Sequence, residues 1–402
     1  GQPMQTVVLA AGEGTRMRPL TVATPKPMVP AAGRPLLEHT LDRAADAGAS
    51  RFIVVVGYEA NQVRDHFGDN HCGVDIKYAT QTEQRGTADA VRAAASHLDD
   101  APFVVLNGDV IYDTESLATL YNSGPAVGSY RVDNPSNYGV LQLDADDDTR
   151  VTGVVEKPAN PGSNLINTGS YVFPASATDH LDVSTSERGE LELTDVLEAV
   201  CAEATVTAVP FDRWLDVGRP WELLAANEWL LESISTRLNG IVSDDATIEG
   251  SVIVEPEATV KAGVIIEGPA YIGRGATVGP NAYIRGSTAL GAGAKVGHAV
   301  EVKNSVLMAD ATVGHLSYVG DSILGAGVNF GAGTKVANLR HDDEPVALTV
   351  KGERVSTGRR KFGVVVGDEA KTGINTSLNA GIVLGAGVTT TPGEVLTRDR
   401  WE

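Results

Sequence analysis

An aliphatic residue recurs at every sixth position through much of the second half of the chain. The uninterrupted series has ten members: Ile248, Val254, Val260, Ile266, Ile272, Val278, Ile284, Leu290, Val296 and Val302. Small residues commonly stand two positions before the aliphatic one. A period of six is typical of hexapeptide repeats, in which three repeats form one triangular coil of a parallel β-helix and the aliphatic side chains point into the prism. We therefore predict a β-helix here.

The repeat continues toward the C-terminus with local irregularities. Steps of five residues occur from Val302 to Leu307 and from Val319 to Leu324. A polar segment, residues 338–362, interrupts the series, which then resumes at Val366. We interpret this segment as a loop inserted into a continuing β-helix.

The first half follows a different pattern, in which short β-branched runs alternate with helix-like segments. This alternation predicts an α/β domain with a largely parallel sheet, whose loops at the carboxyl ends of strands are suited to phosphate. The predicted strands are Thr6–Ala10, Arg51–Gly57, Pro102–Leu106 and Thr205–Val209, and the predicted helices are Leu36–Ala47 and Thr87–Ser96. Residues Trp221–Leu238 are apolar at helical spacing. We expect a domain at 1–220, a linker helix at 221–239 and a β-helix at 240–402.

Charge and composition exclude several classes of protein. With 52 acidic and 32 basic residues, the 402-residue chain has a net charge of -20, which disfavours general binding to nucleic acid or anionic lipid. The acidic run from Asp144 to Asp148 suggests a surface adapted to high salt. No apolar run approaches the length of a membrane span and no leader pattern is evident, so we expect a cytoplasmic protein. Cys72 and Cys201 fit no metal-ligand spacing, so neither a disulfide framework nor a zinc site is expected.

The strand at Thr6–Ala10 leads into a glycine-rich segment. It reads Leu9-Ala10-Ala11-Gly12-Glu13-Gly14-Thr15-Arg16-Met17-Arg18-Pro19-Leu20, followed by Pro25-Lys26-Pro27. Glycines allow backbone N–H groups to face an anion, and Arg16 adds a planar set of donors, so the segment suits a nucleoside triphosphate. A plain strand-to-helix turn is the alternative for the glycines alone. The spacing fits neither the phosphate loop that ends in Gly-Lys-Ser/Thr nor the dinucleotide fingerprint.

In the β-helix, residues 18 apart should stack at the inter-strand spacing, and one such column carries charge. It consists of Glu249, Glu267, Arg285 and Lys303. The adjacent positive charges of Arg285 and Lys303 would repel each other unless an anion lies beside them. A bound phosphate is one answer, and the nearby Glu267 and Glu301 are the other.

The whole N-terminal string resembles the signature of sugar-1-phosphate nucleotidylyltransferases, and further matches follow in order. They are Gln81-Thr82-Glu83-Gln84-Arg85-Gly86-Thr87-Ala88, Asn107-Gly108-Asp109, Tyr138-Gly139, Glu156-Lys157-Pro158, Asn167-Thr168-Gly169 and Trp214-Leu215-Asp216-Val217-Gly218. The resemblance implies the following roles: catalysis by Arg16, Lys26 and Lys157; Mg²⁺ binding by Asp109 and Asp216; sugar binding by Gly139, Glu156, Asn167 and Thr168; and nucleotide binding by Leu9, Ala11, Gly12, Gly14, Thr15, Gln81, Gly86 and Thr87.

These roles agree with the chemistry of nucleotidyl transfer. A sugar 1-phosphate attacks the α-phosphorus in line while pyrophosphate leaves, so catalysis consists mainly of positioning and charge neutralisation. Mg²⁺ prefers a few carboxylates and phosphate oxygens. A charged Asp109 at the end of an apolar strand is otherwise costly. The 156–158 and 214–216 segments resemble thymidylyltransferases more than bacterial uridylyltransferases, so UTP and dTTP both remain open.

The segment Gly314-His315-Leu316-Ser317-Tyr318-Val319-Gly320-Asp321 resembles the catalytic segment of bacterial glucosamine-1-phosphate acetyltransferase domains. The match continues with Asn329-Phe330-Gly331-Ala332-Gly333-Thr334 and Asn338. The resemblance implies a left-handed β-helix in which His315 takes the amine proton as the sugar attacks acetyl-CoA. It also implies phosphate binding by Arg285 and Lys303 and amino-sugar binding by Tyr318 and Asn329.

Two features depart from the bacterial enzymes and resemble archaeal bifunctional ones. Ile374 stands where a serine near CoA is usual, and the insertion carries Gly358-Arg359-Arg360-Lys361, which suits either CoA phosphates or a solvated loop. Asn338 and Ile374 mark the expected acetyl-CoA region. The resemblance also implies a homotrimer formed by the β-helix.

Three hypotheses follow for function. The first is a bifunctional enzyme that acetylates glucosamine- or galactosamine-1-phosphate and couples a sugar 1-phosphate to UTP or dTTP. The second keeps only nucleotidyl transfer, with a structural β-helix. The third is a non-catalytic regulatory subunit, against which the intact Arg16, Lys26, Asp109 and Asp216 argue.

Overall fold

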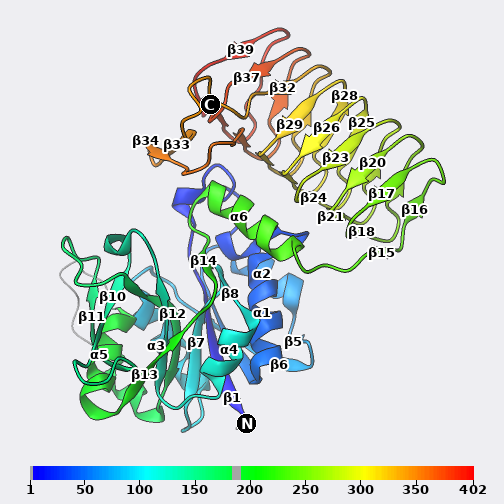
Figure 1. The fold of residues 1–402 in the computed structure, drawn as a ribbon. Helices are drawn as coiled ribbons and strands as arrows, with labels where there is room; N and C mark the ends of the chain where they lie inside the picture. The colour runs from blue at the N-terminus through cyan, green and yellow to red at the C-terminus, as the bar shows by residue number, and fades with distance from the viewer. Residues whose placement is uncertain (1–2, 183–191) are drawn as a thin grey trace. The chain divides into compact units, whose positions relative to one another are not determined.

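The computed structural model describes residues 3–182 and 192–402, which fold into two compact units (Figure 1). The first comprises the ranges Gly1–Glu13, Pro25–Met28 and Leu36–Asp216. The second comprises Gly14–Thr24, Val29–Pro35 and Val217–Glu402. The N-terminal segment thus contributes residues to both units.

The first unit is built on a mixed sheet of ten strands. Their order is β10 (Gly139–Leu143), β11 (Arg150–Glu156), β13 (Val206–Pro210), β9 (Ala126–Arg131), β12 (Leu165–Phe173), β7 (Phe103–Asn107), β1 (Met4–Ala10), β4 (Ala49–Val56), β6 (Val74–Thr80) and β5 (Asn70–His71). Strand β1 pairs in parallel with both β4 and β7, and β4 with β6. The carboxyl ends of these strands therefore meet at one edge, where the sequence places its glycine-rich loop. Apart from β13 with β9, the other neighbours pair antiparallel, so the sheet is mixed and not largely parallel as predicted.

Helices cover both faces of this sheet. They are α1 (Leu36–Ala47), α2 (Ala60–Phe67), α3 (Thr87–Ala94), α4 (Thr114–Tyr121) and α5 (Leu193–Glu203). Successive residues of β1 face opposite sides: Val7 belongs to the core under α3 and α5, and Val8 to the core under α1 and α4. The predicted strands and helices of this half are confirmed, with ends displaced by one or two residues.

The second unit contains three parallel ladders that form the sides of a β-helix, as Figure 1 shows. The first ladder is β15 (Arg237–Leu238), β18 (Val252–Val254), β21 (Ala270–Ile272), β24 (Thr288–Leu290), β27 (Val306–Leu307), β30 (Ile323–Leu324), β35 (Val365–Val366) and β38 (Val383–Leu384). The second is β16 (Ile241–Val242), β19 (Thr259–Val260), β22 (Thr277–Val278), β25 (Lys295–His298), β28 (Thr312–His315), β31 (Asn329–Phe330) and β36 (Lys371–Thr372). The third is β17 (Thr247–Glu249), β20 (Ile265–Glu267), β23 (Tyr283–Arg285), β26 (Glu301–Lys303), β29 (Tyr318–Gly320), β32 (Lys335–Val336), β37 (Ser377–Leu378) and β39 (Val395–Leu396).

The six-residue aliphatic series lines the interior of this prism. Ile266, Ile272, Val278 and Ile284 are fully buried in one continuous core. Where a coil is a residue short, hydroxyls of the preceding coil satisfy backbone N–H groups: Ser305 N donates to Thr288 Oγ1, and Ser322 N to Ser305 Oγ. The predicted parallel β-helix is confirmed, and the arrangement is consistent with a left-handed one.

One segment precedes the repeats and another interrupts them. Helix α6 (Pro220–Leu231) ends before the predicted Leu238, because Arg237 and Leu238 pair with Ile253 and Val254 and open the first coil. The polar insertion carries a hairpin of β33 (Ala347–Val350) and β34 (Glu353–Ser356), and the β-helix resumes at β35. Among the described residues, no helix is both long and apolar enough to span a membrane.

Candidate active sites

The loops after β1, β4, β6 and β7 lie against one another in the first unit. Gly108 N donates to Leu9 O (2.9 Å), and the Gln84 side chain donates to Ala11 O (2.7 Å). A Cβ atom added at Gly12 would meet nothing within 4 Å, so that stretch of backbone borders open space. The predicted nucleotide-binding residues Leu9, Ala11 and Gly12 therefore lie at the edge where the parallel strands end.

Gln81 is held in one orientation by its neighbours. Its side chain is buried, and Nε2 donates to Gly86 O (3.2 Å) and to Asp89 Oδ2 (3.1 Å). Because both amide hydrogens point at these acceptors, the side chain presents its carbonyl oxygen as a hydrogen-bond acceptor. Thr87, also predicted to bind nucleotide, begins α3 and accepts a hydrogen bond from Leu193 N (2.8 Å) through its hydroxyl.

The two predicted metal-binding aspartates lie at one end of a short ribbon. Strand β8 (Val110–Tyr112) pairs antiparallel with β14 (Trp214–Asp216), and Asp216 lies opposite Val110, the residue after Asp109. Lys26 Nζ contacts Asp109 Oδ2 at 2.5 Å, and both side chains are largely buried. Pairing with a cation lowers the cost of burying the Asp109 carboxylate. The sequence predicted all three residues but not the contact between Lys26 and Asp109.

Tyr112 connects the β8–β14 ribbon to the ten-stranded sheet through hydrogen bonds of its hydroxyl group. Its hydroxyl accepts from Asn107 N (3.1 Å) and donates to Gly169 O (3.2 Å). Burial raises the pKa of the Tyr112 phenol well above its usual value, so the group keeps the proton that it donates. Sequence reasoning missed Tyr112, whose only signal was its place three residues after Asp109.

Trp214 contacts two of the segments that are predicted to bind the sugar. Its indole packs edge-on against Tyr138 (centroids 5.5 Å apart), and Nε1 donates to Thr168 O (3.0 Å). Gly139 lies opposite Glu156 across the β10–β11 pair, and a Cβ there would lie 3.1 Å from Glu156 Oε2. Lys157 follows with a positive φ of 43°, and its N–H donates to Tyr138 O (3.0 Å).

The two residues of the next sugar-binding segment differ in exposure. Asn167 is half-buried, donates to the Tyr171 hydroxyl (2.7 Å) and accepts from Gly169 N (2.8 Å). Thr168 is buried, and its hydroxyl is hydrogen-bonded to Ser170 Oγ (2.6 Å). The Thr168 hydroxyl is therefore engaged inside the protein in this structure, and its predicted contact with the sugar stays a prediction.

The segment with Gly14, Thr15 and Arg16 belongs to the second unit. Gly14 has φ +70° and precedes a 3₁₀ turn, and its carbonyl accepts from the Thr21 hydroxyl (2.5 Å). Arg16 lies against Gly218, where a Cβ would come within 2.8 Å of the guanidinium. Gly218 thus leaves room for the Arg16 side chain.

In the β-helix, Lys303 and Asp321 form the centre of a polar cluster. Lys303 Nζ lies 2.9 Å from Asp321 Oδ2, and the Asp321 side chain is only 2% exposed. Asp321 also accepts from Asn304 (2.9 Å) and Asn338 (2.7 Å), and Asn338 donates to the Tyr318 hydroxyl (3.1 Å). No role was predicted for Asp321, although it contacts two of the predicted residues, Lys303 and Asn338.

The charged column predicted from the 18-residue spacing is confirmed. Glu249 pairs with Glu267, and Arg285 with Lys303, in the third ladder. Arg285 donates to Glu301 (2.8 Å), so each positive charge has its own acidic partner. Of the two acidic residues named in the alternative, Glu301 does contact Arg285, whereas Glu267 accepts from Tyr283 (2.8 Å) and Lys303 contacts Asp321 instead. Arg285 and Lys303 each have several N–H donors, so an ion pair with one carboxylate does not prevent either side chain from also binding a phosphate.

The remaining predicted acetyl-transfer residues lie elsewhere on the prism. His315 ends β28 and is exposed, next to Leu316, which has φ +51°. Asn329 lies on β31 between Thr312 and Lys371 in the second ladder, whereas Arg285, Lys303 and Tyr318 belong to the third. Ile374 is 53% exposed. One chain therefore presents these residues on two sides of the prism.

The three charges of the insertion are mostly engaged within the same unit. Arg359 contacts Glu228 of α6 (2.7 Å), and Arg360 contacts Asp343 (3.0 Å). Lys361 pairs with Leu339 at the base of the insertion through its backbone, which leaves its charge out of this count. These contacts favour a structural role for the segment over capture of CoA phosphates.

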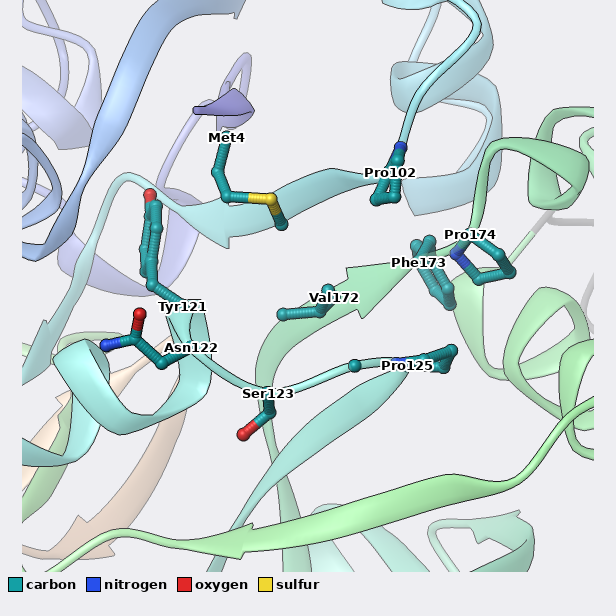
Figure 2. Close-up of a pocket in the computed structure, with 10 residues that line it drawn as sticks. Met4, Pro102, Tyr121, Asn122, Ser123, Pro125, Val172, Phe173 and Pro174 are labelled. Carbon is teal, nitrogen blue, oxygen red and sulfur yellow. The ribbon is translucent and has the colours of Figure 1, made fainter. Parts of the chain in front are cut away.

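A cavity of about 310 Å³ lies at the end of the ten-stranded sheet where the parallel strands β1 and β7 begin, opposite to the glycine-rich loop (Figure 2). Met4 at the start of β1, Pro102 before β7, and Phe173 at the end of β12 line it. The polar groups of Asn122 and Ser123 donate to backbone carbonyls of their own helix, so the lining is largely apolar. None of the predicted site residues lines this cavity.

The fold and these sites define a nucleotidyltransferase domain joined to a parallel β-helix, and comparisons with known proteins agree. The nucleotidyl transferase family matches residues 5–233, and the GMPPB C-terminal domain family matches residues 266–385. The chain is 42% identical over 391 residues to "Bifunctional protein GlmU" of Methanococcus vannielii, covering 95% of this chain and 92% of the relative. It is 39% identical to "Bifunctional sugar-1-phosphate nucleotidylyltransferase/acetyltransferase" of Sulfurisphaera tokodaii, covering 98% of both chains.

A solved structure of UDP-glucose pyrophosphorylase with UDP-glucose matches with a TM-score of 0.52 and 22% identity, over 57% of this chain and 98% of that one. At this identity the match shows the fold alone. The near full-length relatives show more: the chain belongs to the family of archaeal bifunctional sugar-1-phosphate nucleotidylyltransferase/acetyltransferases.

Proposed function

We propose that the nucleotidyl transferase region, residues 5–233, carries out nucleotidyl transfer to a sugar 1-phosphate and that the β-helix acetylates an amino-sugar 1-phosphate. The observation that carries the first activity is the placement of Asp109 and Asp216 at one end of the β8–β14 ribbon, with Lys26 on Asp109. In the reaction, a phosphate oxygen of the sugar 1-phosphate bonds to the α-phosphorus, and the bond from that phosphorus to the departing pyrophosphate breaks.

The carboxylates of Asp109 and Asp216 fit Mg²⁺, which prefers a few acidic oxygens together with phosphate oxygens. Bound there, the ion would neutralise phosphate charge. Lys26 and Lys157 would bind the attacking phosphate and the α-phosphate, and Arg16 the leaving pyrophosphate. Gly139, Glu156 and Asn167 would contact the sugar, which the proximity of Trp214 and Tyr138 supports.

Gln81 supports a preference for uracil or thymine over cytosine. Its amide hydrogens are directed at Gly86 and Asp89, so its carbonyl oxygen can accept the ring N3–H of uracil or thymine. Cytosine has an acceptor at N3 and would face another acceptor. UTP and dTTP differ in the 5-methyl group of the base and in the 2′-hydroxyl of the sugar, and this hydrogen bond distinguishes neither.

For acetyl transfer, the Lys303–Asp321–Asn338–Tyr318 cluster is the supporting observation. Arg285 and Lys303 would bind the sugar phosphate. The sugar amine bonds to the thioester carbon, the carbon–sulfur bond breaks, His315 takes the amine proton, and the CoA thiolate is protonated. Because Asn329 and Tyr318 lie on different ladders of one chain, we infer that a neighbouring β-helix completes the site in a homotrimer, with Asn338 and Ile374 toward acetyl-CoA.

Both activities are tested on the full chain at high salt, as its acidic surface suggests. Pyrophosphate release from UTP and dTTP with a sugar 1-phosphate is compared between wild type and Asp109→Asn. Thiol release from acetyl-CoA with glucosamine-1-phosphate and galactosamine-1-phosphate is compared between wild type and His315→Ala. We expect each variant to lose one activity and keep the other. Pyrophosphate release without any sugar-dependent thiol release would leave the β-helix a structural module.

A further inference from the structure

Outside both sites, three side chains with metal-binding atoms converge in the first unit. Asp42 of α1, His71 of β5 and Cys72 of the following turn each place one potential ligand atom within 4.8 Å of the others. In Figure 1, β5 lies next to α1, and the contact between His71 and Asp42 joins these two elements. His71 Nε2 lies 2.6 Å from Asp42 Oδ1, and Cys72 Sγ lies 3.5 Å from the same oxygen. Among the residues described here, this is the one group of three or more such side chains so close together.

The contacts of Asp42, His71 and Cys72 do not fit a catalytic site in which a histidine activates a cysteine thiol as the nucleophile. In such a site the imidazole lies between the thiol and the carboxylate, so that it can take the thiol proton. Here the imidazole and the thiol both approach Asp42 Oδ1. In a tetrahedral metal site each ligand atom has the other ligand atoms as near neighbours. The oxygen of Asp42, with the nitrogen of His71 and the sulfur of Cys72 close to it, has this arrangement.

The spacing agrees with a tetrahedral ion. With zinc bonds of about 2.0 Å to oxygen and about 2.3 Å to sulfur, two such ligands at a tetrahedral angle lie about 3.5 Å apart. The Asp42–Cys72 distance has this value. The oxygen–nitrogen edge would be about 3.3 Å, so His71 would have to withdraw by roughly 0.7 Å as the ion enters. His71 and Asp42 have side chains that are 16% and 25% exposed, so the group is accessible from solvent.

The turn that carries the cysteine is unusual in its residue choice. His71 pairs with Val74, and the two intervening residues, Cys72 and Gly73, have φ +52° and φ +78°. A two-residue turn with both φ values positive favours Asn-Gly or Asp-Gly. A cysteine adopts a positive φ less readily than an asparagine or aspartate does, so the geometry of the turn does not explain why residue 72 is a cysteine.

Although the spacing of the cysteines predicted no zinc site, we propose that Asp42, His71 and Cys72 bind one divalent transition-metal ion of the zinc type, with water as the fourth ligand. A carboxylate, an imidazole and a thiolate suit Zn²⁺ and not Mg²⁺. Binding needs a Cys72 thiolate and an unprotonated imidazole nitrogen of His71, so it releases protons and is favoured by rising pH. The ion would join α1 to β5, the outermost strand of the ten-stranded sheet, and thereby protect that edge.

The experiment uses the full chain with excess Mg²⁺ to occupy the active-site carboxylates. Zn²⁺ uptake after dialysis is measured by elemental analysis, and Co²⁺ is added to report a thiolate-to-cobalt charge-transfer band. We expect one equivalent of Zn²⁺ and the cobalt band in wild type and in Cys201→Ser, which retains Cys72 as the only thiol. His66→Gln, which removes a neighbouring surface imidazole that contacts Glu38 (2.9 Å), should also retain both signals.

The ligand variants decide the assignment. Cys72→Ser, His71→Gln and Asp42→Asn should lose the bound Zn²⁺, and Cys72→Ser should lose the cobalt band. Cys72→Asn keeps a residue suited to the turn, so it should fold without metal and show none of the rise in melting temperature that excess Zn²⁺ gives wild type, on the order of 5 °C. Absence of a thiolate band in wild type, or unchanged Zn²⁺ uptake in Cys72→Asn, would overturn the proposal.

Discussion

Lys303 and Asp321, 18 residues apart and on successive coils of the β-helix, form an ion pair with a separation of 2.9 Å between Nζ and Oδ2. Asp321 is almost fully buried, and Lys303 is 15% exposed. The ion pair stabilises the β-helix, and Lys303 is also proposed to bind the sugar phosphate. Substitutions at Lys303 and Asp321 should therefore affect both stability and acetyl transfer, and these two effects can be measured separately.

We expect Lys303→Ala to lower the free energy of unfolding of the β-helix by about 3 kcal/mol, because it leaves a buried carboxylate without its cation. Acetyl transfer should be lost as well. Chemical unfolding followed by circular dichroism measures the first effect and thiol release the second. Lys295→Ala, which removes an exposed lysine from the neighbouring ladder, is the control.

The double variant Lys303→Met/Asp321→Asn separates the two effects. It removes both charges, so it should recover much of the lost stability while acetyl transfer stays absent. Full activity in this variant would show that Lys303 serves only the fold.

Asp89 holds the Gln81 amide, so Asp89→Asn should loosen base selection. Loss of one hydrogen bond to a charged group, about 1.5 kcal/mol, predicts a fall in kcat/KM for UTP of roughly tenfold, with a smaller fall for CTP. Pyrophosphate release with each nucleotide is the measurement. Since Asp89 also contacts Arg92 (2.5 Å), Arg92→Gln is the matched control and should leave the UTP-to-CTP ratio unchanged.

Gly169→Ala should impair nucleotidyl transfer through Asn107. Gly169 has φ +77°, and an added Cβ would lie 2.3 Å from Asn107 Nδ2, two residues before Asp109. The left-handed conformation alone costs about 1–2 kcal/mol in an alanine. We expect a lower melting temperature for the first unit and a reduced kcat for pyrophosphate release. Gly162→Ala, where no atom lies within 4 Å of the added Cβ, should behave as wild type.

Asp368 gives a prediction for pH. Burial raises the pKa of its carboxyl, against the opposing effect of the hydrogen bond from Ala326 N. The folded state therefore holds this proton more tightly than the unfolded chain, and the associated stability is lost as pH rises from about 4 through the raised pKa. Asp368→Asn should raise the melting temperature at pH 7 and flatten its decline between acid and neutral pH.

Asp399→Asn is the control for that measurement. Asp399 likewise accepts a hydrogen bond from a backbone N–H, that of Val383 (2.9 Å), in the same β-helix. A change in pH dependence of equal size in both variants would contradict the assignment to Asp368.

Much of the architecture could be predicted from the sequence, because each repeat length in the sequence corresponds to a fixed repeat in the structure. The six-residue series identified the β-helix, and the 18-residue spacing placed Arg285 beside Lys303. In the first half, the end of a strand placed Asp109 at the sheet edge. Such predictions depend on local patterns that each coil or strand repeats without reference to distant residues.

Other features depended on partners that no local pattern connects. Thr168 belongs to a sugar-binding motif, yet its hydroxyl turns inward to Ser170 because residues 167–171 leave the regular β9–β12 register. The end of α6 was likewise decided by the pairing of Arg237 and Leu238 with the next coil.

The sequence by itself therefore determined the two folds and most of the residues of both proposed sites, through periodicity and motif order. Only the tertiary structure decided which groups contact one another: Lys26 with Asp109, Asp321 with Lys303, and Asp42 with His71 and Cys72. The physical reason is that electrostatic and hydrogen-bonding partners act over a few ångströms in space. A chain that folds back on itself brings residues to that distance irrespective of their separation in sequence.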